Sequence, residues 1–436
     1  MSPRLDIRSR PGTVAPAPQV RRLGWFLAGA SIILICVATL TPQPGHSETS
    51  PFCILCGSLG GVDAVLNVLL FLPLGIGLAL SGARLRSALL AILIFSATIE
   101  VAQFLVISGR DPAIGDVLTN VLGGSIGFGL VRRFDVWWNP SRRDATLLSS
   151  FWVACWLAIQ LLASYGLTPA FPSTRYYGQI ARVFENMATF GGRVLSATID
   201  TVSVPDFGYA KTRQFHDLLE HGAVVRAVVI PAGPTSRIAP IIRVADERQR
   251  QIVLLGQDRA DVVFGVHTGA ENLRLRPPLF RIAGVFPSEG GPAGLRFSDT
   301  LDLGGRYRAS GVDIEAASRV ATHSQHFILS SALGWVLILP KQWYLENTRT
   351  ELLLGFVWLA TLLLPLGYWS LLAAAARTGE TQSRFVPAVG ALAIVLFAGL
   401  VLIPRSFGLA QASLGAWLAT ALGLAVGVAL ASKKRP

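Results

Sequence analysis

Charged residues are scarce in this chain. Only 15% of its 436 residues are Asp, Glu, Lys or Arg, and 52% are hydrophobic. This balance excludes an ordinary soluble protein and indicates a membrane protein. Cysteine is scarce too: the chain has four, none between residues 169 and 348, so that segment is not a disulfide scaffold. The sequence also lacks a phosphate-binding glycine motif before a helix and the context of a nucleophile elbow.

Long apolar runs, in contrast, are abundant. Eight of them approach the length that crosses a hydrocarbon core of about 30 Å. The expected spans are residues 23–40, 62–80, 87–107, 114–131, 147–167, 352–375, 386–403 and 409–431. The first is longer than the apolar core of a signal peptide, so we expect it to be retained. The sequence therefore predicts a polytopic α-helical membrane protein of about eight transmembrane helices.

Basic residues fall almost entirely on one side of these spans. Alternate short segments hold sixteen Lys and Arg, and the opposite short loops hold only Arg110 and Arg405. The bias predicts that both termini are cytoplasmic in an inner (plasma) membrane protein. These charges lie next to spans and are not interleaved with aromatic platforms, so we expect them to contact anionic membrane lipids and not nucleic acid.

The segment between the fifth and sixth spans is different in character. It has no long apolar run, and short Val- and Ile-rich stretches alternate with Gly and Pro turns. We expect strands at residues 194–204, 223–230, 251–255, 261–267, 280–286 and 326–339. Many short strands at this spacing predict a β-sandwich, and the topology makes it an inserted extracytoplasmic domain.

Five regions follow from these features. They are a disordered basic cytoplasmic tail (1–22), a four-helix membrane domain (23–133), a cytoplasmic linker with the fifth helix (134–168), the β-sandwich domain (169–348) and three C-terminal helices (349–436).

Polar residues interrupt three consecutive spans at helical spacing. The pairs are Asp63 with Asn67, Glu100 with Gln103, and Asp116 with Asn120. Residues three or four apart share a helix face. The alternating span directions bring all six to one layer in the outer part of the membrane, because Glu100 lies only about 10 Å below the outer end of its span.

This layer is a candidate site, since ionisable groups inside a bilayer usually face a bundle interior or a cavity. If the chain is an enzyme, Glu100, Asp116 and Asp63 are the catalytic candidates, and the first two would act as a general base or hold a divalent cation. Arg110 would hold phosphate. Asn67, Gln103 and Asn120 would orient substrate. The simpler alternative is that these groups only join helices by hydrogen bonds.

The same residues carry a family resemblance. Asp63-x3-Asn67-x3-Phe71-x-Pro73-Leu74-Gly75, Glu100-x2-Gln103, Arg110 and Asp116-x3-Asn120-x2-Gly123 resemble the VanZ-like family. The resemblance covers residues 23–133. It implies a cell-envelope membrane protein, linked in some members to glycopeptide antibiotic tolerance, and supplies no established reaction.

A fainter resemblance concerns the β-rich segment. The stretches 254–258 and 261–264 are similar to concanavalin A-like or laminin-G-like domains. Such folds often bind glycans, but a fold alone does not confer that function.

Cys53 and Cys56 lie in the first external loop, with two residues between them. They can form a structural disulfide, act as a redox pair or bind metal. A zinc site would need two further ligands, and His46 is the only nearby imidazole.

The leading functional hypothesis is an outward-facing pocket for a polar or phosphorylated head group, such as that of a lipid-linked glycan or cell-wall intermediate. The alternative is a non-enzymatic membrane-anchored protein that binds glycan, or acts as a scaffold, through its β-sandwich. A transporter ranks third, because no inverted repeat relates the two halves.

Overall fold

The computed structural model describes residues 17–42, 52–107, 113–182, 187–287, 299–374 and 381–433. Within them, eight helices are long and apolar enough to cross a membrane by length and composition. This confirms the predicted polytopic fold. The helices are α1 (Pro18–Leu40), α2 (Gly60–Leu80), α3 (Leu85–Leu105), α4 (Ile114–Arg132), α6 (Arg142–Leu167), α9 (Arg349–Ala374), the α10–α11 span and α12 (Leu414–Ser432).

The seventh of these spans is not one regular helix. It begins in α10 (Thr381–Phe397), passes through a π-helical turn (Ala398–Leu402) and ends in α11 (Ile403–Ser406). A short helix, α5 (Phe134–Trp138), follows α4. Its aromatic side chains pack together: Phe134 and Trp137 have ring centroids 4.9 Å apart.

The chain divides into two compact units. The N-terminal unit comprises Met1–Gly57 and Asp63–Asn139, and the C-terminal unit comprises Ser58–Val62 and Pro140–Pro436. The N-terminal unit contains α1 to α5. The β domain shares the C-terminal unit with α6 and with α9 to α12.

In the N-terminal unit, glycines let α2 and α4 approach closely. A Cβ on Gly75 would overlap the backbone of Gly124, and one on Gly127 would overlap the carbonyl of Leu72. Small residues commonly bring membrane helices together in this way. Apolar side chains fill the remaining space: Phe71 and Ile92 are completely buried in a cluster that also contains Ile35 of α1.

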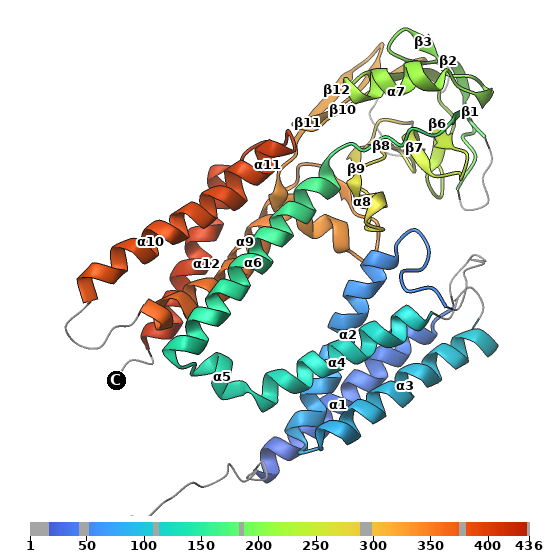
Figure 1. Ribbon diagram of the computed structural model, residues 1–436. Helices are drawn as coiled ribbons and strands as arrows, with labels where there is room; N and C mark the ends of the chain where they lie inside the picture. The colour runs from blue at the N-terminus through green and yellow to red at the C-terminus, as the bar shows by residue number, and fades with distance from the viewer. Residues whose placement is uncertain are drawn as a thin grey trace, which may run out of the picture. The chain divides into compact units, whose positions relative to one another are not determined.

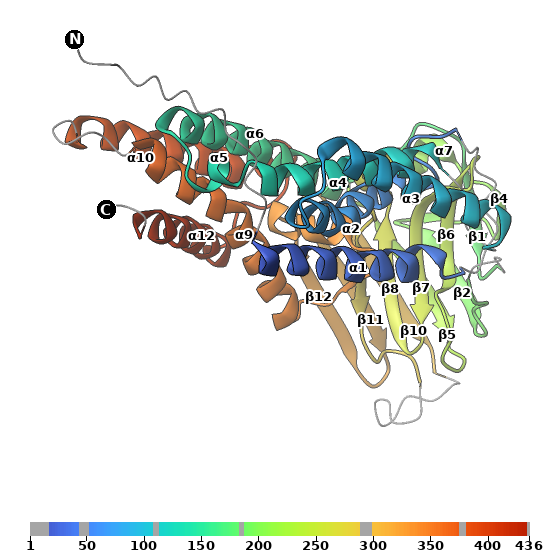
Figure 2. The ribbon, with the colours of Figure 1, turned by 90° about the horizontal axis from the view of Figure 1, so that it is seen from below.

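The C-terminal unit contains two sheets (Figures 1 and 2). The seven-stranded sheet has the order β13-β9-β8-β7-β6-β1-β4, and the six-stranded sheet has the order β12-β11-β10-β5-β2-β3. Neighbouring strands are antiparallel except for β13 and β9. The strands are β1 (Tyr176–Ile180), β2 (Arg193–Ile199), β3 (Val202–Ser203), β4 (Phe207–Tyr209), β5 (Val224–Ile230), β6 (Ala239–Asp246), β7 (Gln251–Asp258), β8 (Asp261–Val266), β9 (Leu279–Ile282), β10 (Leu301–Arg308), β11 (Gly311–Ser318), β12 (Thr322–Ile328) and β13 (Tyr344–Leu345).

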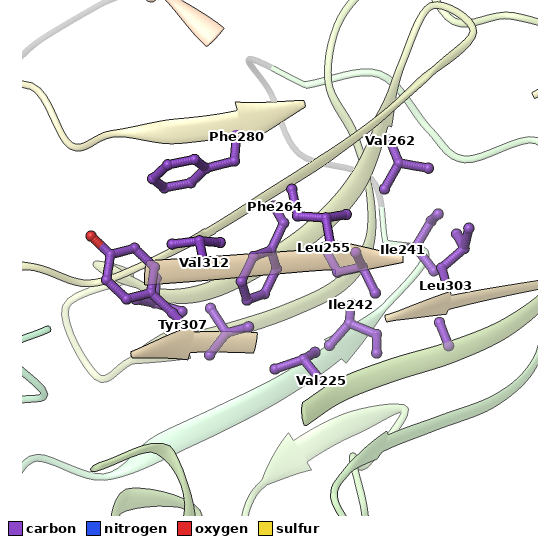
Figure 3. Packing of buried hydrophobic residues seen from close by; sticks show 14 of the residues in the cluster. Val225, Ile241, Ile242, Leu255, Val262, Phe264, Phe280, Leu303, Tyr307 and Val312 are labelled. Carbon is purple, nitrogen blue, oxygen red and sulfur yellow. The ribbon is translucent and has the colours of Figure 1, made fainter. Parts of the chain in front are cut away.

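Apolar residues of both sheets form one core (Figure 3). Phe264 of β8 and Val312 of β11 are completely buried in it. Gly305 of β10 makes room for Phe264, because a Cβ there would overlap the phenyl ring. Sheets that face each other across such a core build a sandwich, so the predicted β-rich insertion is present.

One expected strand is largely wrong. Residues 326–339 were predicted as a single strand, but β12 ends at Ile328 and Ser331–Ile338 forms a 3₁₀ helix, η1. Trp335 and Leu337 of this helix are buried. A short, continuously apolar run does not distinguish a buried strand from a buried helix. The stretch 280–286 is likewise a strand only as far as Ile282.

The β domain packs directly on the ends of its helices. Its core includes Leu167 at the end of α6, Leu337 of η1 and Leu409, just before α12. The hydroxyl of buried Tyr307 donates to the carbonyl of Leu167 at 2.7 Å. Two short helices, α7 (Thr212–Glu220) and α8 (Gly269–Asn272), complete the domain. The core is therefore continuous from the strands to the helix ends.

Candidate functional site

The predicted polar layer lies entirely within the N-terminal unit. Glu100 is its most buried carboxylate, with 8% of the residue exposed. Its Oε2 accepts a hydrogen bond from the backbone N–H of Ala113 at 2.8 Å. Ala113 is the N-cap residue of α4, so Glu100 joins the last turns of α3 to the start of α4. A carboxylate at a helix N-terminus is favoured by the helix dipole.

Asp116 and Asn67 connect a second pair of helices. The Asn67 amide on α2 donates from Nδ2 to Oδ1 of Asp116 on α4, at 2.9 Å. Both side chains are partly exposed, and Asp63, one helical turn before Asn67, is exposed. The aspartates therefore lie on the accessible side of the layer, whereas Glu100 lies on its buried side.

Asn120 lies one turn deeper than Asp116. Its Nδ2 donates to the hydroxyl of Ser96 on α3 at 2.9 Å. Its Oδ1 is buried and accepts no hydrogen bond from any described residue. The Ser96 hydroxyl can donate or accept, so either orientation of the Asn120 amide leaves one of its polar atoms without a described partner. Leaving a buried polar atom unsatisfied costs about 1–3 kcal/mol.

Gln103 extends the layer to the first helix. Its Nε2 donates to the carbonyl of Thr39, near the end of α1, at 2.9 Å. The residue is buried, with 6% exposed. All four long helices of this unit therefore contribute a polar group at the same end of the bundle, as the alternating span directions predicted.

The disulfide loop covers the start of α4. Cys53 and Cys56 are joined as a disulfide with Cα atoms 5.6 Å apart. The N–H of Gly115 donates to the carbonyl of Cys53 at 3.2 Å. Glycine is required here, because a Cβ on Gly115 would overlap the carbonyl of Ile54. The loop thus lies beside the residue that precedes Asp116.

Two contributors were not singled out from the sequence. Ser96, which is completely buried, lies one turn before Glu100 on the same face of α3, and that spacing was a usable signal. The backbone carbonyl of Thr39 carries no side-chain signal at all. Arg110, the expected phosphate ligand, and His46 lie outside the described residues.

The described residues contain no group of three or more His, Cys, Asp or Glu side chains arranged to hold a metal ion. The layer offers carboxylate and amide groups instead. Such groups can accept hydrogen bonds from hydroxyl or ammonium groups, and Asn67, Gln103 and Asn120 can also donate.

Comparison with known proteins identifies the region that carries this layer. Residues 19–137 match the family model described as VanZ/LLP1. No curated protein and no solved structure matches the chain, so the fainter likeness of the β domain to concanavalin A-like folds is not supported. The chain therefore contains a VanZ/LLP1-like segment, which coincides with the helices α1 to α5.

Proposed function

We propose that the polar layer of the N-terminal unit binds the polar head group of an envelope lipid, such as a lipid-linked glycan or cell-wall intermediate. The supporting observation is the buried side-chain oxygen of Asn120, which has no described partner. Asn120 is hydrogen-bonded to Ser96, one turn before the buried Glu100 on α3, and lies one turn below the partly exposed Asp116. Buried polar groups that serve only to join helices are usually hydrogen-bonded. A ligand hydroxyl or amine would satisfy the Asn120 oxygen.

The described groups favour a ligand rich in hydrogen-bond donors. Glu100 and Asp116 would accept from sugar hydroxyls or an amine, and Asn120 would accept one more hydrogen bond from inside the bundle. Asn67 and Gln103 are already engaged, with Asp116 and Thr39 respectively. Their role would be to hold the neighbouring groups in place. A phosphate on the same head group would be the part that Arg110 recognises.

The proposal includes an orientation. The basic flanks of the spans favour cytoplasmic termini, which would make the polar layer open to the outer face and the β domain extracytoplasmic. The β domain would then be available to the glycan part of the same intermediate. Tolerance to glycopeptide antibiotics would follow if sequestering that intermediate reduced the target of the drug.

Should the site also catalyse a reaction, Glu100 is the best placed base. Its carboxylate is buried and already bonded to one backbone N–H, which fixes its orientation. Proton transfer requires the ligand atom to lie within hydrogen-bond reach, about 2.6–3.2 Å. Binding is the primary proposal, and this chemical role depends on it.

The experiment is native mass spectrometry of the protein extracted with its lipids, comparing wild type with Glu100→Gln. The amide retains an oxygen that can accept from Ala113, so the helix connection survives while the charge is lost. We expect a co-purifying glycolipid or phosphorylated lipid in the wild type, reduced about tenfold or more in the variant, the change produced by losing about 1.4 kcal/mol of binding free energy.

Thr98→Val is the matched control. Thr98 lies on α3, two residues from Glu100, and is exposed with its hydroxyl bonded to its own helix. Its replacement should leave the lipid unchanged. An empty wild type, or identical ligands in wild type and Glu100→Gln, would sink the proposal and turn attention to the β domain. Loss of expression in Glu100→Gln would favour a purely structural layer.

A further inference from the structure

A large cavity lies in the C-terminal unit, far along the chain from the polar layer. Its volume is about 600 Å³. Protein interiors are close-packed and contain few voids larger than a water molecule, whereas ligand sites commonly measure about 300–1,000 Å³. The cavity thus has the size of a binding site and not of a packing defect.

The cavity is bounded by the β domain on one side and by helix starts on the other. Phe280 of β9 and Phe327 of β12 contribute from the domain core. On α9, Glu351, Gly355 and Leu359 follow one another at four-residue spacing and so share one face. The first turn of α12 supplies Gly415 and Ala416. Small residues at this junction leave the space open.

Its lining is mainly apolar, and the apolar surface continues outside it. Ile328, which lines the cavity, is 62% exposed, and Leu352, another lining residue, is 73% exposed. Leu414, which precedes Gly415, is 75% exposed. Leu352 and Leu414 lie in the first turns of α9 and α12, two helices that are apolar enough to span a membrane, and Ile328 is the last residue of β12. The mouth therefore adjoins the surface that hydrocarbon chains would cover.

A minority of the lining residues are polar, among them His326, Asn347 and Glu351. Asn347 donates from Nδ2 to the carbonyl of His326 at 2.7 Å, and His326 contacts Asp313 at 2.6 Å. Glu351 accepts from the N–H of Glu346 at 2.9 Å. A mainly apolar space with some polar groups in its wall fits an amphiphile.

We propose that this cavity binds one hydrocarbon chain of a membrane lipid, with the polar part of the lipid near His326 and Asn347. Water is a poor occupant, because apolar cavities stay dry or take apolar ligands. Hydrocarbon chains are the apolar molecules present at this position of a membrane protein. The inference does not rest on the head-group site proposed for the N-terminal unit, since the two sites share no residue.

The test uses the full-length protein reconstituted in phosphatidylcholine–phosphatidylglycerol vesicles. The probe is a phosphatidylcholine that carries a photoactivatable diazirine near the end of one acyl chain, and labelled peptides are identified by mass spectrometry. We expect labelling of the peptides that contain Phe356 and Ala416, saturating as the probe fraction rises. Labelling of an ordinary lipid-facing surface rises in proportion to the probe instead.

Gly415→Phe should fill the cavity. A Cβ at this position meets only the Ser413 hydroxyl, at 3.7 Å, so the new ring can enter without moving the backbone. We expect labelling of these two peptides to fall about tenfold, the consequence of losing about 1.4 kcal/mol of binding free energy. Gly390→Phe in α10 is the matched control, because nothing lies within 4 Å of its Cβ position and it does not line the cavity.

Unchanged labelling in Gly415→Phe would overturn the proposal. So would wild-type labelling that never saturates at these peptides. A third outcome would also overturn it: the two peptides stay unlabelled, and Gly415→Phe converts a dimer to a monomer. The cavity would then be filled by a second copy of this chain. Should Gly415→Phe fail to fold, the saturation behaviour of the wild type still decides the matter.

Discussion

At the scale of single residues, Glu271 shows how a local motif can make the β domain sensitive to pH. It completes a capping box at α8: Thr268 donates both its N–H and its hydroxyl to Oε2 of Glu271, each at 2.9 Å. Burial of the carboxylate raises its pKa to about 7, against the opposing effect of these hydrogen bonds. The folded protein therefore holds the Glu271 proton more tightly than the unfolded chain does. The protonated carboxyl contributes fully to stability below the pKa of the unfolded chain, and this contribution is lost as the pH rises through the pKa of the folded protein.

Glu271→Gln should remove this loss. The amide oxygen of the variant can still accept from Thr268. An amide does not ionise, so the variant loses no proton between pH 4.5, the pKa of the unfolded carboxyl, and about 7. We expect the melting temperature of the variant relative to wild type to rise from pH 5 to pH 8. Between these pH values, the free energy of unfolding of the variant relative to wild type should change by at most about 3 kcal/mol. Partial solvation of the side chain makes the change smaller.

The neighbouring His267 acts in the opposite sense. Burial lowers its pKa, so its contribution to stability is lost as pH falls below about 6.5. Wild type and Glu271→Gln both contain His267, so its pH-dependent contribution cancels when their stabilities are compared. Glu315→Gln, on the exposed side of β11, is the control for loss of a carboxylate. Parallel pH curves for wild type and Glu271→Gln would contradict the prediction.

At the scale of helices and strands, the elements that could be predicted from the sequence were those with a clear hydropathy pattern. A membrane helix must satisfy its own backbone, so length and apolarity suffice to find it. The polar pairs were visible for the same reason, because they interrupt apolar runs. Buried strands offer no such contrast: β6 and β10 were not anticipated, and η1 was assigned to a strand. Pairing between Ser96 and Asn120 depends on how α3 and α4 rotate, which no local pattern records.

Helix α4 provides a matched pair of glycines. A Cβ on Gly127 would overlap the carbonyl of Leu72 on α2, whereas nothing lies within 4 Å of the Cβ position of Gly129. Gly127→Ala should therefore force α2 and α4 apart and destabilise the unit by about 1–3 kcal/mol, the usual cost of overpacking. Gly129→Ala should leave stability unchanged or slightly higher.

Thermal unfolding of both variants in the same detergent measures the difference. A lower melting temperature for Gly127→Ala alone is the expected outcome. Equal effects of the two substitutions would mean that α2 and α4 do not pack through Gly127. The result also bears on the polar layer, because Asn67 and Asp116 connect these same two helices.

At the scale of the whole molecule, the β domain and the helices of its unit share one hydrophobic core. Leu167, Leu337 and Leu409 belong to the same hydrophobic core as the strands. Deleting residues 175–345 would therefore remove η1 and uncover the ends of α6 and α12. Such a deletion does not separate the role of the β domain from that of the helices. Single substitutions in the head-group layer and in the cavity are the better probes.

The proposed orientation is testable with single cysteines in a Cys36→Ala, Cys155→Ala background. Cys53 and Cys56 are joined and do not react with a maleimide. Thr201, in the turn between β2 and β3, and Asp135, in α5, are both exposed. In intact spheroplasts, a membrane-impermeant maleimide should label Thr201→Cys at once and Asp135→Cys only after permeabilisation. In the proposed orientation, the basic residues that flank α5 place it on the cytoplasmic side, and one span, α6, separates the two positions. The reverse pattern would make the head-group layer face the cytoplasm, where it would meet lipid intermediates before their export.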